Sequence, residues 1–410
     1  MDRVILHSYL NGFYASVECL YRPELRDKPI AVGGDEDARH GIILAKNELA
    51  KKYGVQTGEP LWKARQKCPD IIFVPANFDR YLRYSKMTRE IYEEYSPKVQ
   101  AFGLDEAWID VTGSTHLFGN GEQIANQIRK RVKFELGVTV SVGVSFNKIF
   151  AKLGSDMKKP DATTVLSREN FKEKVWRLNA NELLYIGRAT STYLKRYGIY
   201  TIGDVAKADV KFLNHILGKN GDMLWSFANG LDNSPVTNIG FKSAVKSVGN
   251  STTTPKDLLT DNDVRITFCM LAESVAARLR EQSFKCKTLQ IYVRDNELNS
   301  YERQGKFPFP LCTSADLAEK AFELFTLSRP NKPIRSLGIR ACDLVDDEFF
   351  QLSFMPDRLK NQKEESLEYA LDDIRYRFGN RSVLRGLVMT DKQLSHHDPK
   401  DNHKTFPVGY

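Results

Sequence analysis

Two adjacent acidic residues, Asp105 and Glu106, carry the clearest chemical signal in this sequence. They stand at the junction of two apolar runs, 99–102 and 107–111. Neighbouring side chains of a regular strand point to opposite faces, but a tight turn lets both carboxylates reach one site. Mg²⁺ prefers such hard oxygen ligands and usually keeps substrate phosphates in its shell. A metal site is therefore the functional interpretation of the pair. The alternative, which the spacing alone favours, is a solvated turn that carries two acids.

Two aromatic residues, Phe13 and Tyr14, follow the first predicted strand at 3–6. Adjacent rings at a junction between a strand and a helix are commonly part of a core. The functional alternative is a floor for a nucleotide sugar, with one ring excluding a 2′-hydroxyl group by contact. The residues alone leave both interpretations open.

Several lysines lie where a triphosphate could meet them. Lys51 and Lys52 close a predicted helix, where the helix dipole by itself explains a positive charge. Lys148 and Lys152 are four residues apart and share a helix face, and Lys159 follows at the exit of that helix. A triphosphate needs several such donors, whereas a solvated helix face needs none in particular.

Composition describes a folded chain with a modest basic excess. Its 410 residues predict two to three domains, and 41% of them are hydrophobic. Lysine and arginine exceed the acidic residues by 60 to 52, which suggests an anionic partner such as nucleic acid. No run approaches about 20 apolar residues, so we expect no membrane span. The early polar residues predict no signal peptide, and six scattered cysteines predict a cytoplasmic protein with reduced thiols.

Predicted elements divide the chain into parts of different character. Strands and helices alternate up to about residue 168, and 169–235 is helical with glycine turns. Within it, 184–187 followed by a helix over 189–197 has a helix–hairpin–helix form, whose backbone N–H groups can approach a DNA phosphate. Residues 242–255 have the composition of a linker, and 262–346 alternates again. An amphipathic helix, expected as a packing or docking element, covers 362–378, with its apolar positions at Leu367, Leu371, Ile374 and Phe378.

Taken together, the motifs of this chain resemble the Y-family DNA polymerases, the lesion-bypass group. The resemblance spans residues 4 to about 375, and it rests on the ordered segments 13–18, 28–32, 103–110, 141–148 and 156–160. It implies an α+β multidomain fold shaped like a right hand. The expected parts are a ferredoxin-like palm (1–18 and 77–168), small fingers (19–76), a helix–hairpin–helix thumb (169–235), an α/β little finger (242–346) and a tail (347–410).

The resemblance also implies an activity and its residues. Such enzymes add dNTPs to a primer opposite damaged template bases, without proofreading and as monomers. Asp105 and Glu106 would be the catalytic acids, holding two Mg²⁺ ions together with the Leu10 carbonyl group. The remaining assignments are Tyr14 as the gate against ribonucleotides with Phe13 beside it, Lys51 and Lys159 for the triphosphate, and Ile186, Gly187, Lys246 and Arg335 for DNA.

One position departs from the family pattern. The family has an aspartate four residues before Phe13, and this chain has Tyr9 there. A phenol with a pKa of about 10 is neutral at pH 7 and is no hard anionic ligand. We therefore expect an impaired polymerase, or alternatively a non-catalytic DNA- and clamp-binding protein on the same scaffold. A nucleotidyl cyclase, a third idea, would not explain the helical hairpin or the segment 242–346.

The tail contains a second signal for a partner. Residues 350–355 are similar to the short peptides that bind the bacterial sliding clamp. Such a peptide buries its apolar side chains in a clamp pocket while its glutamine makes a polar contact, and the matching positions are Gln351, Leu352 and Phe354. A strand-like cap on the preceding domain is the alternative.

Overall fold

The computed structural model describes residues 2–34, 41–241, 244–347 and 356–395, and in the last range it leaves out the side chains of 356–362, 392 and 395. It divides into two compact units, the first comprising the described residues 2–34 and 42–241, and the second 41 together with those of 244–395. No helix in these described ranges is both long and apolar enough to cross a membrane. The tail positions Gln351, Leu352 and Phe354 lie outside the described residues.

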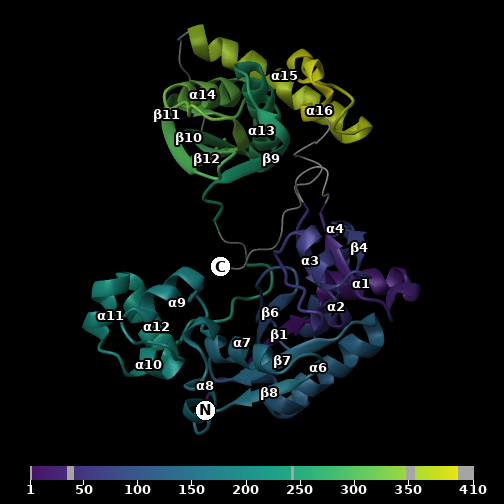
Figure 1. The fold of residues 1–410 in the computed structure, drawn as a ribbon, viewed down its shortest axis with the longest axis vertical. Helices are drawn as coiled ribbons and strands as arrows, with labels where there is room; N and C mark the ends of the chain where they lie inside the picture. The colour runs from purple at the N-terminus through teal and green to yellow at the C-terminus, as the bar shows by residue number, and fades with distance from the viewer. Residues whose placement is uncertain (1, 35–40, 242–243, 348–355, 396–410) are drawn as a thin grey trace. The chain divides into compact units, whose positions relative to one another are not determined.

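A five-stranded sheet in the order β5-β6-β1-β7-β8 organises the first unit (Figure 1). Its strands are β1 (Ile5–Leu10), β5 (Val99–Ala101), β6 (Glu106–Asp110), β7 (Val140–Ser145) and β8 (Thr163–Leu166). β1 pairs antiparallel with both β6 and β7. Because β1 is central, both of its faces are covered, and all of its residues except Tyr9 are buried. It also runs on to Leu10, four residues beyond the predicted end.

Alternation along β1 assigns its side chains to two different cores. Leu6 and Leu10 belong to the core formed with α4 (Phe78–Glu93) and α6 (Gly121–Leu136). Ile5 packs on the other face with Ala151 of α7 (Lys148–Met157). Since side chains alternate along a strand, Tyr9 shares the α7 face. β7 approaches α7 closely at Gly143, where an added Cβ atom would lie 1.9 Å from the Ala151 carbonyl oxygen.

A smaller three-stranded sheet lies within the segment 19–76. Its order is β3-β2-β4, from β2 (Ile30–Gly33), β3 (Ile43–Lys46) and β4 (Ile72–Pro75). The helices α2 (Glu48–Lys52) and α3 (Leu61–Lys67) share a small core of their own with this sheet. In the chain, this sheet follows α1 (Phe13–Tyr21), which begins directly after β1.

Five short helices make up the segment 171–228. They are α8 (Phe171–Val175), α9 (Arg188–Lys195), α10 (Ile202–Lys207), α11 (Val210–Leu217) and α12 (Lys219–Ala228). Their core includes Leu194, Ile202 and Leu213, and it continues to Phe150 of α7. The helical segment is therefore packed against α7 through a shared core.

The second unit is an antiparallel sheet in the order β11-β10-β12-β9. Its elements are β9 (Val248–Leu258), α13 (Asp261–Glu281), β10 (Phe284–Asp295), β11 (Ser300–Leu311), α14 (Ser314–Thr326) and β12 (Ile334–Asp346). The linker predicted over 242–255 is wrong from Val248 onward, because those residues form β9. β9 pairs along β12 through its backbone, and most of its side chains are only partly buried. A polar sequence can therefore form this strand.

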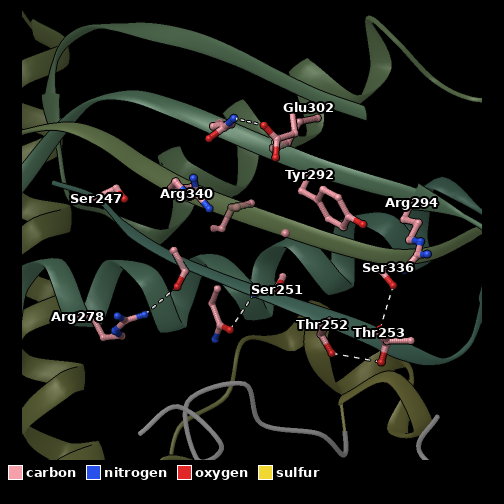
Figure 2. A pocket seen from close by; sticks show the side chains of 16 residues that line it. Ser247, Ser251, Thr252, Thr253, Arg278, Tyr292, Arg294, Glu302, Ser336 and Arg340 are labelled. Carbon is pink, nitrogen blue, oxygen red and sulfur yellow. Dashed lines mark hydrogen bonds between the residues drawn. The ribbon is translucent and has the colours of Figure 1, made fainter. Parts of the chain in front are cut away.

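The face of this sheet away from α13 and α14 is polar. A groove of about 1010 Å³ lies on it. Figure 2 shows its lining side chains, which include Tyr292, Arg294 and Arg340. Thr253 and Ser336 join across β9 and β12 through their hydroxyl oxygens, 3.0 Å apart. The buried Leu289, by contrast, belongs to the core under the helices.

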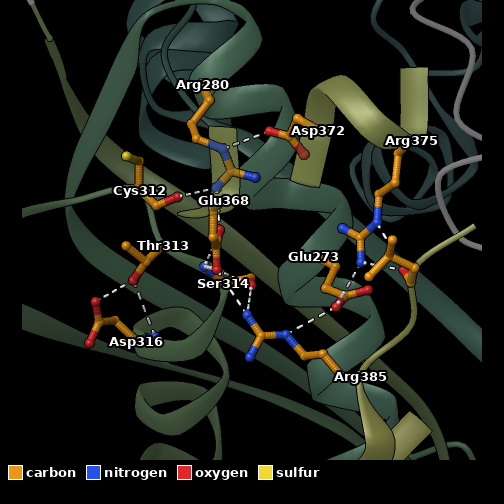
Figure 3. Close-up of polar contacts among 11 residues, drawn as sticks. Glu273, Arg280, Cys312, Thr313, Ser314, Asp316, Glu368, Asp372, Arg375 and Arg385 are labelled. Carbon is orange, nitrogen blue, oxygen red and sulfur yellow. Dashed lines mark hydrogen bonds and ion pairs between the residues drawn. The ribbon is translucent and has the colours of Figure 1, made fainter. Parts of the chain in front are cut away.

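The long helix α15 (Pro356–Phe378) docks through its charged side rather than its apolar side (Figure 3). The Glu368 carboxylate is buried, where it pairs with Arg280 and accepts a hydrogen bond of 2.9 Å from the Ser314 N–H group. Two residues of the predicted apolar stripe, Leu367 and Phe378, remain 59% and 75% exposed. The helix is amphipathic, but ion pairs fasten it to the unit.

Candidate active site

Four of the predicted site residues come together at one end of β1 and β6. Tyr9 and Glu106 are direct partners in the antiparallel pairing of these strands. The backbone N–H group of Leu10 donates to the Asp105 carbonyl oxygen at 2.8 Å. Gly103, with a φ of 81°, makes the turn that leads into Asp105. The structure therefore places Tyr9, Leu10, Asp105 and Glu106 next to one another.

Glu106 is held by two side chains that approach from the α7 face. Its carboxylate lies 3.1 Å from Nε2 of the fully buried His7 and forms an ion pair with Lys152. His7 Nδ1 in turn lies 2.8 Å from the Ser155 hydroxyl oxygen. Burial acts to raise the pKa of Glu106, but the neighbouring His7 and Lys152 outweigh it and lower the pKa to about 2. Glu106 is therefore a fixed carboxylate at neutral pH.

Asp105 is in a different electrostatic state. Burial, followed by the neighbouring charge of Glu106, raises the pKa of Asp105 to about 6. Lys152 and Lys159 oppose this shift without cancelling it. The negative charge at Asp105 is thus incompletely compensated by the protein.

Tyr9 occupies the space next to these acids. Its ring lies against Lys159, whose Nζ atom is 3.2 Å from the ring centre. The same Nζ atom is 2.8 Å from Asp156 Oδ1. Burial, and then the charges of Asp105 and Glu106, raise the pKa of Tyr9, so its phenol is neutral at every physiological pH. Tyr9 adds bulk and a hydroxyl group here, but no negative charge.

The aromatic pair after β1 forms a fixed platform beside the acids. Tyr14 stacks on Tyr81 with ring centres 4.2 Å apart, and Phe13 is buried beneath. Tyr81 in turn donates to Glu18 at 2.9 Å. Burial, and then the charge of Asp105, raises the pKa of Tyr14 to about 12. Tyr14 thus presents a partly exposed, immobilised ring near Asp105.

The other predicted residues of the first unit lie on α2 and in the hairpin before α9. Lys51 is on α2, half exposed and 3.4 Å from Glu48. The hairpin 184–187 precedes α9, and a groove of about 360 Å³ between it and α7 includes Lys152 in its lining. The Ile186 side chain is 3% exposed and belongs to the helical core, so it offers only its backbone to a ligand. Gly187, the N-cap of α9, is exposed.

Two further predicted DNA contacts belong to the second unit. Lys246 is exposed just before β9, and Arg335 lies on β12 with a partly exposed side chain. Arg340 of the same strand lines the polar groove (Figure 2). The cationic residues of this unit thus include some on the open face of the sheet.

Sequence reasoning missed His7 as a partner of Glu106. The signal was available, because His7 is two residues before Tyr9 and therefore faces the same side of β1. Lys152 was noted only as part of a helical face, and the sequence did not show that it would meet Glu106 rather than a phosphate.

Comparison with known proteins decides the family. Residues 8–156 match the model of the impB/mucB/samB family, and 245–354 match the model of its C-terminal domain. The DNA polymerase IV of Acetivibrio thermocellus is 52% identical over 397 residues, covering 96% of this chain and 100% of that protein. DNA polymerase IV 1 of Halalkalibacterium halodurans is 37% identical over 390 residues, covering 94% of this chain and 93% of that protein. The chain belongs to the Y family of DNA polymerases.

The fold agrees with that family. A Y-family DNA polymerase chimera matches with a TM-score of 0.73 and 23% identity, covering 84% of this chain and 99% of the chimera. The predicted right-hand α+β fold is thereby confirmed. This Y-family chain is a DNA-directed DNA polymerase, which acts on primer–template DNA and dNTPs.

Y-family DNA polymerases generally use divalent metal ions, so the donors in this chain can be tested against that need. Asp105 and Glu106 offer carboxylates and Leu10 a carbonyl oxygen. Among the described residues, no group of three or more His, Cys, Asp or Glu side chains is arranged to hold a metal ion. Tyr9 is neutral, and Lys152 already pairs with Glu106. The residues present do not fit a pair of divalent cations.

Proposed function

We propose that this chain is a translesion DNA polymerase scaffold that binds primer–template DNA and dNTP but transfers nucleotides slowly. The observation that carries the proposal is the pairing of Tyr9 with Glu106 across β1 and β6. That position is where the family pattern places an aspartate. A neutral phenol there leaves two carboxylates at a site where Mg²⁺, which favours several anionic oxygens, would otherwise be held.

Binding is expected to survive this loss, because the residues assigned to it remain in place. Tyr14 would contact the sugar of the incoming nucleotide, with its ring fixed on Tyr81 and the buried Phe13 packed beside it. Lys51 and Lys159 would meet the triphosphate. We assign the palm to 1–18 and 77–168, the fingers to 19–76, the thumb to 169–235, the little finger to 242–346 and the tail to 347–410.

Primer–template DNA would contact the parts that present backbone donors and cations. In the first unit these are the hairpin backbone at Ile186 and Gly187. In the second unit they are Lys246 and Arg335, together with the polar sheet face. Such contacts are made mainly to phosphates, so the affinity should fall steeply with salt.

We also propose that residues 350–355 bind the bacterial sliding clamp through Gln351, Leu352 and Phe354, with the polymerase acting as a monomer. The support is the sequence pattern of that peptide. Deleting 350–355 should abolish stimulation by the clamp and leave DNA binding unchanged, whereas undiminished stimulation would refute the assignment.

A non-catalytic DNA- and clamp-binding protein is the second candidate, and Tyr9 favours it. Asp105, Glu106, Tyr14 and Lys159 argue against it, because a chain that had lost its chemistry would tolerate change at these positions too. The two candidates differ in whether residual primer extension depends on Asp105.

Primer extension with Mg²⁺ tests the proposal directly. Tyr9→Asp should raise the rate by about 100-fold or more, which corresponds to an activation free energy lower by roughly 3 kcal/mol. Tyr9→Phe is the matched control and should remain as slow as the wild type. DNA affinity, measured by fluorescence anisotropy, should be equal in all three proteins. Equal extension rates for wild type and Tyr9→Asp would overturn the proposal.

A further inference from the structure

Three aromatic side chains form an exposed cluster where α9 ends against α11. The rings of Tyr193 and Tyr197 lie 5.4 Å apart, and those of Tyr197 and Phe212 lie 5.5 Å apart, both edge to face. Tyr197 is 45% exposed and Phe212 is 38% exposed. The cluster therefore presents ring surface to solvent instead of completing the helical core.

Positive charges surround these rings. Lys195, Arg196 and Lys211 are all exposed, and the Arg196 guanidinium group lies 6.0 Å from the centre of the Tyr193 ring. A nearby acid, Asp209, caps α11 by accepting a hydrogen bond of 2.9 Å from the Phe212 N–H group. Its charge therefore stabilises the N-terminus of that helix.

Asp204 is also engaged at a helix start, as the third residue of α10 in a capping box with Thr201. Its carboxylate accepts hydrogen bonds from the Tyr200 and Thr201 N–H groups at 3.0 and 2.8 Å. Tyr200 itself is 53% exposed. The surface thus combines open aromatic faces with exposed cations, while the adjacent carboxylates serve as helix caps.

From this combination we propose that the cluster of Tyr193, Tyr197 and Phe212 is a binding site for single-stranded DNA. Bases stack on exposed aromatic rings, and phosphates pair with flanking cations. Duplex DNA does not suit such a site, because its bases already stack on each other. An acidic peptide would use the cations but has no need of the ring faces, so charge and ring surface together favour a nucleic acid strand.

The site is distinct from the hairpin assigned to primer–template DNA. That hairpin ends at Gly187, the N-cap of α9, whereas Tyr193 and Tyr197 lie at the C-terminal end of this helix. Eight residues of α-helix extend about 12 Å. A single strand on the cluster and a duplex at the hairpin would therefore use different ends of α9.

A competition experiment on the full chain tests this inference. The protein is first saturated with an unlabelled hairpin primer–template, and a labelled oligothymidylate is then titrated while its anisotropy is measured. We expect the oligothymidylate to bind this complex, and an abasic strand of equal length to bind about tenfold more weakly. The double variant Tyr197→Ala, Phe212→Ala should lose about the same factor for oligothymidylate.

Two further variants guard against a folding artefact. Phe134→Ala removes a ring of α6 that is 82% exposed, and it should leave oligothymidylate binding unchanged. Tyr197→Phe keeps the ring and should bind like the wild type. The inference is overturned if the saturated complex does not bind oligothymidylate, if abasic strands bind equally well, or if the double variant binds normally. This inference rests on the proposed function only because the primer–template must first saturate its own site. The affinity of that duplex is therefore measured separately.

Discussion

The ammonium nitrogen of Lys159 lies 3.2 Å from the centre of the Tyr9 ring and 2.8 Å from Asp156 Oδ1. A lysine held in this way must leave the ring before it can meet a triphosphate. We therefore predict that Tyr9→Leu raises the affinity for dNTP about threefold to tenfold, since a cation–π contact contributes roughly 0.5–2 kcal/mol. The measurement is dNTP binding to the DNA complex in EDTA. Tyr9→Phe retains the ring and should match the wild type; a gain in Tyr9→Phe as large as in Tyr9→Leu would contradict this explanation.

Sugar discrimination should depend on the Tyr14 ring and not on its hydroxyl group. In the Tyr9→Asp background, Tyr14→Val should increase ribonucleotide incorporation relative to deoxyribonucleotide by at least about tenfold. The smaller valine leaves room for a 2′-hydroxyl group. Tyr81, on which Tyr14 stacks, is held by its hydrogen bond to Glu18 and cannot move into that room. Single-nucleotide extension with matched dNTP and rNTP gives the ratio. Tyr14→Phe is the control, and its selectivity should be unaltered.

The second unit should depend strongly on one buried carboxylate. Glu368 pairs with Arg280 and Arg385 and accepts from the Ser314 N–H group. Glu368→Gln should lower the free energy of unfolding by about 3–5 kcal/mol, because two cations lose a buried counter-charge. Calorimetry resolves the transition of this unit. Asp373→Asn, which breaks an exposed pair with Arg377, should cost less than about 1 kcal/mol; equal losses in the two variants would argue against a special role for burial.

Stability should change with pH through Asp105. Its pKa is about 6 in the folded chain, against 3.8 for an aspartate in water. Between these values the folded state binds more protons than the unfolded state, so stability falls as pH rises from about 4 to about 6. Asp105→Asn should remove this contribution and be more stable than the wild type at pH 7, by up to about 3 kcal/mol. Urea unfolding in EDTA at pH 4 and pH 7 measures the difference, and a variant less stable at pH 7 would disprove the sign.

Much of the site was accessible from sequence because its residues are local in the chain. Asp105 and Glu106 follow a glycine turn, and Phe13 and Tyr14 follow a strand end, so local sequence marked both pairs as candidates, and the resemblance to the Y family favoured their functional interpretation. What spacing could not give was the pairing across strands. The register that sets Tyr9 opposite Glu106 depends on contacts between residues about 100 positions apart, which no local pattern specifies.

Polar sequence was the other source of error. The Ser/Thr run before Leu258 has the composition of a linker, yet its backbone groups pair with β12 along an open sheet face where side-chain burial is slight. In α15 the periodic apolar positions identified a helix correctly. They did not identify its docked side, because Glu368 becomes an interior residue only when Arg280 and Ser314 meet it.

β12 ends at Asp346 and α15 begins at Pro356, so the peptide 350–355 joins two elements of the same unit. Beyond it, the chain returns to that unit through Glu368 and the buried Leu394. A partner that takes up this peptide would therefore be attached to the second unit from both sides, through β12 before the peptide and through α15 after it.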